Sequence, residues 1–148
     1  MSPKALAGVF LAALALRGGL ILSMGEPQRG LVGDSPGYIQ AAVNLSMHGV
    51  FSREEKPPLR PDTFRTPGYP VFLMGFVGRD IKPLEPHEFA PRFRAGLALM
   101  AQAGIGAAAA LLTAWLAFLL WGDRRAALAA GALQAADLQS ILHTGLFL

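Results

Sequence analysis

Two short clusters in the sequence combine a charged side chain with glycine, proline and tyrosine. The first cluster is Gly33–Tyr38 and the second is Thr63–Pro70. They contain Asp34 and Arg65, each placed just before the start of a short predicted helix. A carboxylate at such a position can act as a general base or can cap the helix. A guanidinium can bind a phosphate bidentately, and it can also pair with anionic lipid head groups or with a carboxylate such as Asp62. The two residues taken alone leave these alternatives open.

The composition indicates that the clusters belong to a membrane protein. Of the 148 residues, 53% are hydrophobic and 16% are charged, whereas about a quarter of the residues of a soluble domain are charged. Three long stretches contain no charge at all: Ala5–Leu16, Ala95–Trp121 and Ala126–Ala136. This pattern is typical of membrane spans separated by polar loops. We therefore expect an all-α integral membrane protein with three transmembrane helices and an outward loop that contains short juxtamembrane helices.

Residues 1–24 are predicted to contain the first transmembrane helix. Their apolar run is about 20 residues long, which is enough to cross a bilayer. A signal peptide would share the basic start and the apolar centre, but no A-x-A cleavage site follows, so a retained span is favoured. Arg17 lies inside this run. Its side chain is expected either to reach the membrane surface or to face the interior of the protein.

Residues 95–121 are predicted to form the second span, residues 122–125 a tight cytoplasmic turn and residues 126–148 a third span. The second span is rich in glycine and alanine, which allow helices to approach closely. The third carries Asp137, which is expected to hydrogen-bond a neighbouring span or to line the cavity of an active site. Because this predicted helix is still running at the last residue, we expect the chain to be the amino-terminal fragment of a larger protein and to be inactive alone.

The short turn predicts the orientation of the protein in the cell inner or plasma membrane. It contains Arg124 and Arg125, and the positive-inside rule acts most strongly on short loops. The turn and the amino terminus are therefore expected in the cytoplasm, and residues 25–94 on the periplasmic or extracytoplasmic side. Within this long loop, residues 36–48 and 67–77 have the pattern of short helices. The second is too short to span a bilayer, so we expect it at the membrane interface or beneath the rest of the protein.

The residue types also exclude several classes of site. The 13 Lys and Arg residues give a formal net charge of +3, but they are scattered among acids, so no nucleic-acid partner is expected. The chain has no cysteine, which excludes disulfides and thiolate metal sites. His48, His87 and His143 are far apart in the sequence and lack the spacing of metal ligands. No metal site is therefore predicted from these side chains.

Three motifs follow the first predicted span. They are Gly-Asp-x-x-x-Tyr from Gly33, Ala-x-Asn-Leu-x-x-x-Gly from Ala42 and Arg-x-Pro-Gly-Tyr-Pro-x-Phe-Leu from Arg65. Together with the preceding apolar run, they resemble the membrane glycosyltransferases of the C-type fold (GT-C). The branch that they resemble most includes protein O-mannosyltransferases and bacterial aminoarabinose transferases. The resemblance covers most of the chain, up to the third predicted span, and the motif from Arg65 is its most distinctive part.

The resemblance implies a transferase that takes a sugar from a polyprenyl-phosphate donor in the bilayer. The sugar passes to an acceptor hydroxyl of a protein, lipid or glycan on the outer side of the membrane. In that family an acidic residue of the first outward loop is the catalytic base, and Asp34 occupies its position. A basic residue at the start of the second loop helix approaches the donor phosphate, and Arg65 matches it. From the residues themselves, Tyr38 and Tyr69 are expected to be packing or membrane-interface aromatics, with lining of the site as the alternative. Asp137 is the third candidate for lining the site.

A divalent metal is the only cofactor that the resemblance implies, and only some members of the family use one. The common motif in the family is an adjacent Asp-Glu pair. In this chain Ser35 follows Asp34, so the second carboxylate of such a pair is missing and no metal ligand is assigned.

Two other classes of function are compatible with the same residues. One is a small, non-enzymatic membrane scaffold or assembly subunit that is complete at 148 residues and docks its glycine- and alanine-rich spans onto partner helices. The other is part of a transporter, in which Asp137 would lie at mid-membrane beside a broken helix. The third predicted span has no proline to break it, which favours the transferase over the transporter.

Overall fold

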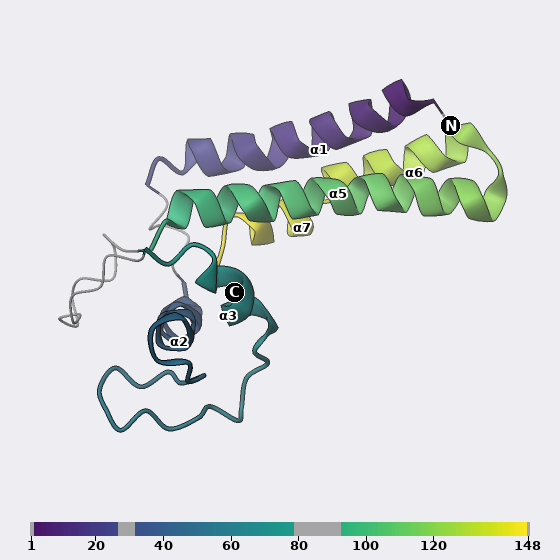
Figure 1. Cartoon of the computed structure of the whole chain (residues 1–148). Helices are drawn as coiled ribbons and strands as arrows, with labels where there is room; N and C mark the ends of the chain where they lie inside the picture. The colour runs from purple at the N-terminus through teal and green to yellow at the C-terminus, as the bar shows by residue number, and fades with distance from the viewer. Residues whose placement is uncertain (1, 27–31, 79–92, 148) are drawn as a thin grey trace. The chain divides into compact units, whose positions relative to one another are not determined.

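The computed structural model describes residues 2–26, 32–78 and 93–147, and all regular elements in these ranges are α-helices (Figure 1). The chain divides into two compact units. The span unit comprises Met1–Glu26 with Leu99–Leu146, and the loop unit comprises Pro27–Ala98 with Phe147–Leu148. Between the helices, the described residues contain only an isolated bridge from Val77 to Phe93. The predicted all-α class is therefore confirmed.

Among the described residues, two helices are long and apolar enough to cross a membrane. The first, α1, runs from Pro3 to Ser23, and the second, α5, runs from Ala95 to Trp121. The hydroxyl of Ser2 caps α1 by accepting the N–H of Ala5 at 3.3 Å, with a proline in the first turn where a missing N–H costs nothing. The bounds of α5 are the ones that the sequence predicts, because a long charge-free run has no competing place to end.

The third predicted span is not a single helix. The chain forms α6 from Arg124 to Ala136 and α7 from Leu138 to Thr144, separated by Asp137 in an extended conformation. The prediction of one helix over residues 126–148 is therefore wrong. A helix of 13 residues is only about 20 Å long, short of the roughly 30 Å of a bilayer core. The carboxylate of Asp137 accepts the N–H of Ser140 at 2.8 Å, and this cap starts a new helix where the old one ends.

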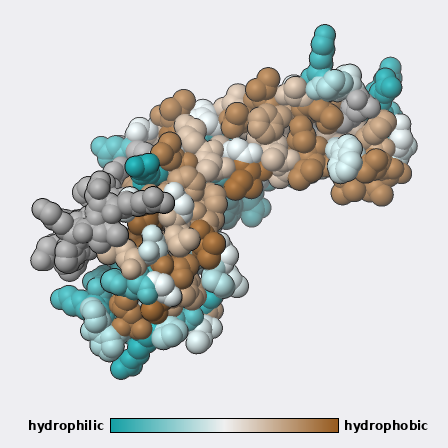
Figure 2. Space-filling model, in the orientation of Figure 1, coloured by the Kyte–Doolittle hydropathy of each residue, from teal (hydrophilic) through white to brown (hydrophobic). Residues whose placement is uncertain are grey.

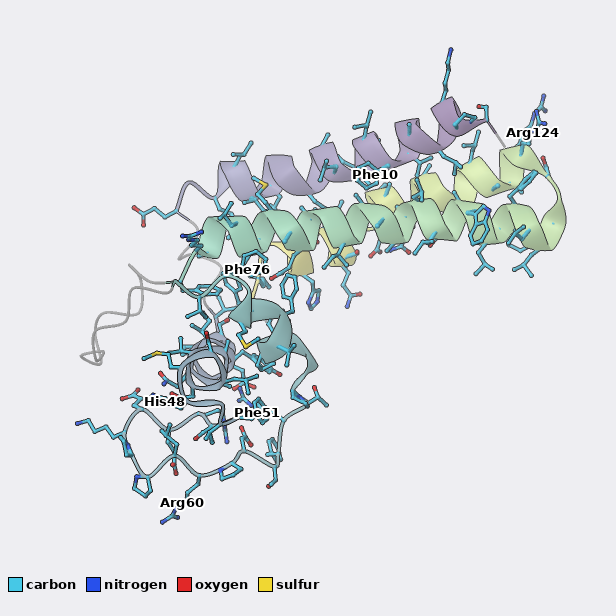
Figure 3. All side chains as sticks on the ribbon, viewed as in Figure 1. Phe10, His48, Phe51, Arg60, Phe76 and Arg124 are labelled. Atoms are coloured by element: carbon cyan, nitrogen blue, oxygen red, sulfur yellow. The ribbon has the colours of Figure 1, made fainter. Side chains whose placement is uncertain are left out.

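Small residues hold the span unit together. Its core is a cluster of four buried alanines from α1, α5 and α6, with Phe10 of α1 packed against it (Figure 3). The alanines are Ala13, Ala107, Ala110 and Ala135. A Cβ at Gly131 of α6 would lie 2.7 Å from the Cβ of Ala114 in α5, so the two helices meet where neither has a larger side chain. The space-filling view shows hydrophobic side chains along the outside of these helices (Figure 2).

The loop unit is built on two helices that pack against each other, α2 from Ser35 to His48 and α3 from Gly68 to Met74. Gly49 ends α2 with φ of 67°, the left-handed conformation that favours glycine. This stop signal is predicted by the sequence and confirmed. The helix α3 is shorter than the predicted range of 67–77. It buries Leu73 and exposes Val71 on its other side.

The segment between α2 and α3 is irregular, as its prolines predict, but it is tied to the helices. The Nδ2 atom of Asn44 in α2 donates to the carbonyls of Ser52 and Glu54, each at 2.8 Å. The N–H of Asp62 donates to the carbonyl of Phe51 at 2.7 Å and closes the segment into a loop. One amide side chain thus replaces the backbone hydrogen bonds that a regular element would supply.

Candidate functional site

Asp34 and Arg65 form an ion pair in the loop unit, although 31 positions separate them in the sequence. Arg65 Nη2 lies 2.6 Å from Asp34 Oδ1. Its Nη1 donates to the backbone carbonyl of Asp34 at 3.4 Å. The side chain of Arg65 is 11% exposed and that of Asp34 is 67% exposed. The guanidinium is therefore held in place, whereas the carboxylate keeps most of its surface open to a reactant.

The orientation of Asp34 answers one of the questions that the sequence leaves open. Asp34 stands at the N-cap position of α2, but its side chain makes no capping hydrogen bond. The carboxylate points to Arg65 instead. The predicted N-cap position of Asp34 is therefore confirmed, but its side chain forms the ion pair instead of a capping hydrogen bond.

Aromatic rings continue the site away from the ion pair. The guanidinium carbon of Arg65 lies 4.8 Å from the centre of the Tyr38 ring, a cation–π arrangement. The Tyr38 ring meets Tyr69 edge-on at 5.3 Å, and Tyr69 stacks on Phe72 at 6.0 Å. Burial raises the pKa of Tyr69, and the neighbouring Tyr38 adds to the shift. Both tyrosines thus lie in one contiguous group with Arg65, where they pack against neighbouring rings.

Ser35 holds the segment that carries Asp34. Its buried hydroxyl donates to the carbonyl of Phe147 and accepts the N–H of Val32 at 2.9 Å. The Phe147 ring is fully buried and meets Phe93 edge-on at 5.4 Å. A glutamate in place of Ser35 would not fit this buried hydrogen-bonded position. Sequence reasoning notes the missing second carboxylate but does not find this role, because Phe147 is 112 positions away.

The alternative partner of Arg65, Asp62, is engaged elsewhere. Asp62 Oδ2 lies 2.5 Å from Arg53 Nε, and its Oδ1 accepts the N–H of Phe64 at 2.9 Å. The N–H of Phe64 and the Arg53 guanidinium hold the pKa of Asp62 below its ordinary 3.8, against the opposing effect of burial. The described residues of the loop unit thus contain two separate arginine–aspartate pairs, and the pairing of Arg65 with Asp62 that the sequence allows is not formed.

Asp137, the fifth predicted site residue, belongs to the span unit and caps α7. The end of α6 just before it is satisfied by Arg17 of α1. Arg17 is fully buried and donates to the carbonyls of Gln134 and Ala135 at 3.4 and 3.2 Å. Of the two predicted placements of Arg17, the one facing the protein interior is therefore confirmed. A cation thus lies at the carboxyl end of α6, where the helix dipole is negative.

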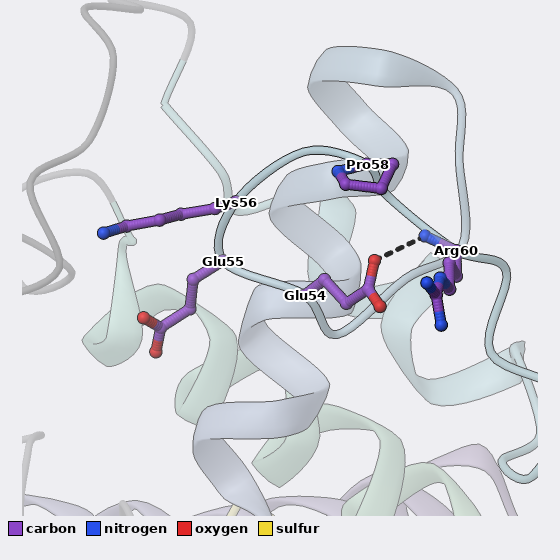
Figure 4. A pocket seen from close by; sticks show the side chains of 5 residues that line it. All are labelled: Glu54, Glu55, Lys56, Pro58 and Arg60. Atoms are coloured by element: carbon purple, nitrogen blue, oxygen red, sulfur yellow. Dashed lines mark hydrogen bonds between the residues drawn. The ribbon is translucent and has the colours of Figure 1, made fainter.

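A surface hollow lies in the irregular segment of the loop unit (Figure 4). It is open, has a volume of about 650 Å³ and is lined by Glu54, Glu55, Lys56, Pro58 and Arg60. The Glu54 carboxylate already accepts the backbone N–H of Arg60 at 2.6 Å. The hollow is lined by two acidic and two basic side chains, so neither an anionic nor a cationic ligand is favoured. The ion pair of Asp34 and Arg65 is the better candidate site because its groups converge.

The described residues around Asp34 do not assemble a set of ligands for a divalent metal. No group of three or more metal-binding side chains occurs in the described parts of the chain. The nearest charged partner of the Asp34 carboxylate is the Arg65 guanidinium, which repels a second cation at the same oxygen.

Comparison of the chain with family models, with curated proteins and with solved structures finds no match.

Proposed function

We propose that the chain belongs to a membrane glycosyltransferase that moves a sugar from a polyprenyl-phosphate donor to an acceptor hydroxyl. In this proposal α1 and α5 lie in the bilayer and the loop unit is on its outer side. Asp34 is the base, and Arg65 binds the donor phosphate. The observation that carries the proposal is the contact between Arg65 Nη2 and Asp34 Oδ1 at 2.6 Å. Sugar transfer from a phosphate needs a base and a phosphate-binding cation within reach of one substrate.

The reaction follows from these two groups. The acceptor oxygen attacks the anomeric carbon of the donor while Asp34 takes its proton. The bond between that carbon and the phosphate oxygen breaks, and the polyprenyl phosphate leaves with the electron pair. Arg65 offsets the charge that develops on the leaving phosphate. A positioned base of this kind contributes about 10²–10⁴-fold to the rate.

The order of binding follows from the ion pair. Arg65 Nη2 is occupied by Asp34 Oδ1 before the donor arrives, so a phosphate oxygen must exchange with the carboxylate. The exchange leaves Asp34 beside the anomeric carbon without its cationic partner. In the proposal, donor binding thus frees the Asp34 carboxylate to accept a hydrogen bond from the acceptor hydroxyl.

The experiment measures sugar transfer in membranes that carry the protein expressed from its full open reading frame. A panel of polyprenyl-phosphate sugars serves as donors. Asp34→Asn is expected to abolish transfer while expression and membrane insertion stay normal. Glu55→Gln is the matched control, because it also replaces an exposed acid of the loop unit but lies outside the ion pair. Near-normal transfer by Asp34→Asn removes Asp34 from the mechanism.

The alternative function, a non-enzymatic scaffold or assembly subunit, gives a different result in the same assay. It predicts no transfer with any donor, and it predicts that Asp34→Asn leaves the assembly of partner proteins unchanged. The small-residue contact between Gly131 and Ala114 stabilises the helices of the chain itself and does not favour this alternative over the transferase.

A further inference from the structure

Gly37 lies in the first turn of α2, where neither the helix nor the backbone conformation requires a glycine. Within a helix, glycine is less stable than alanine by about 1 kcal/mol. The glycines with positive φ in the described residues are Gly25, Gly33, Gly49 and Gly122, and Gly37 is not among them. The reason for a glycine at this position must therefore be the space next to it.

That space is occupied by Arg65. A Cβ at Gly37 would lie 2.8 Å from Arg65 Nη1 and 3.3 Å from Arg53 Cδ. Real Cβ atoms do not approach other heavy atoms as closely as 2.8 Å, so the guanidinium of Arg65 fills the volume of the missing side chain. In this position Arg65 also contacts the Tyr38 ring and the Asp34 carboxylate.

We infer that Gly37 is a positioning residue for Arg65. Because Gly37 has no side chain, the guanidinium of Arg65 packs directly against α2, and in this position Arg65 binds the phosphate of a lipid-linked donor. The identity of the anion rests on the proposed function. The position of Arg65 against Gly37 rests on geometry alone. The anion is a phosphate monoester or diester carried by a lipid, bound where Asp34 Oδ1 now meets Arg65 Nη2.

An alanine at position 37 separates this role from a purely structural one. The clash is with the far end of a flexible side chain, so the backbone does not have to move. The gain in helix propensity also favours the folded state. Gly37→Ala is therefore expected to keep the fold and to displace only the guanidinium. Gly68→Ala is the matched control, since a Cβ at Gly68 meets no atom within 4 Å and Gly68 also lies at the start of a helix in the loop unit.

The position of the Arg65 guanidinium against Gly37 is tested without any substrate. The purified full chain in detergent micelles is treated with the arginine reagent phenylglyoxal, and modification of Arg65 is followed by peptide mass spectrometry. Arg65 is expected to react several-fold faster in Gly37→Ala than in the protein of the original sequence, because the displaced guanidinium leaves its buried position. Gly68→Ala is expected to react at the original rate. Equal rates in all three proteins overturn the inference.

Phosphate recognition is tested by binding of a polyprenyl phosphate to the same proteins. Gly37→Ala is expected to weaken binding by about tenfold or more, the range of one charge-assisted contact. On an Arg65→Ala background, Gly37→Ala is expected to cause no further loss, because its effect acts through Arg65. Unchanged affinity in Gly37→Ala, or no binding by the unmodified protein, overturns the phosphate role. Binding that depends on Gly37 without sugar transfer from any donor defeats the proposed function and leaves the inference intact.

Discussion

Arg17 of α1 donates from Nη2 to the hydroxyl of Ser140 in α7 at 3.0 Å, across 123 positions of the sequence. The same guanidinium binds two carbonyls at the end of α6. A break in a helix exposes backbone carbonyls, and in an apolar environment each unpaired group costs about 1–3 kcal/mol. Arg17 satisfies these carbonyls from inside the protein. The broken helix therefore does not present these carbonyls as free ligands. The break itself was not expected, because the absence of a proline predicts a continuous helix and was the reason for favouring the transferase over the transporter.

Replacing Arg17 is expected to destabilise the span unit. Arg17→Met keeps most of the side-chain volume but leaves the carbonyls of Gln134 and Ala135 without their donor, at a cost of about 2 kcal/mol or more. Thermal unfolding in detergent micelles, followed by circular dichroism, measures the loss. Lys4→Met is the control, because Lys4 is exposed and its removal should not change the transition. An unchanged transition for Arg17→Met would mean that the hydrogen bonds to α6 do not contribute to stability.

Gly106 and Gly104 are two glycines of α5 with opposite expected responses to alanine. A Cβ at Gly106 would lie 2.5 Å from Arg17 Nε and 2.9 Å from its Cδ, whereas a Cβ at Gly104 meets nothing within 4 Å. Arg17 cannot move aside without losing its hydrogen bonds. Gly106→Ala is therefore expected to lower the unfolding temperature, and Gly104→Ala to leave it unchanged or raise it through helix propensity, on the order of 1 kcal/mol. Equal effects of the two variants would contradict the packing of Arg17 against α5.

The pKa of Asp62 lies below its ordinary value of 3.8 and is expected to rise toward that value when its partners are removed. Arg53→Met should raise the pKa part of the way, since the N–H of Phe64 remains as the larger cause. Because the folded state lowers this pKa, the stabilisation that it provides is complete above 3.8 and is lost as the pH falls through the lowered value. Carbon-detected NMR titration of the carboxyl group measures the shift. Asp62→Asn should show no such loss of stability in acid, and a pKa of 3.8 in the unmodified protein would refute the assignment.

Tyr69 is expected to stay protonated at a pH where an ordinary tyrosine ionises. Burial raises its pKa above the ordinary 10.0. The chain has two tyrosines, so Tyr38→Phe leaves Tyr69 as the only source of tyrosinate absorbance. A spectrophotometric titration of this variant should have its midpoint above 10.0, and the variant lacking both tyrosines supplies the blank. A midpoint at 10.0 would show that Tyr69 is not buried against α2.

The features that the sequence determined by itself are local ones. A charge-free run long enough to span a bilayer predicts α5 with its observed bounds, since backbone hydrogen bonds within a helix need no distant partner. The end of α2 at Gly49 is also a local feature, because the left-handed conformation depends on one residue. The grouping of Asp34 and Tyr38 in one cluster, and of Arg65 and Tyr69 in another, is likewise visible in the spacing. What the spacing alone leaves undecided is the partner of each charge.

Those partners were decided only by the tertiary structure. The sequence places Asp34 at the start of α2 but does not show whether its side chain caps the helix or meets a cation. The packing of α3 on α2 brings Arg65 to it. The apolar run after residue 126 predicts one helix, but Arg17 and the carboxylate of Asp137 satisfy the groups at a break. Local helix propensity does not predict these contacts. Arg17 lies more than a hundred positions from the carbonyls that it binds, and the Asp137 cap competes with continuation of the helix. The charges of this protein are therefore placed by packing, and its helices mostly by composition.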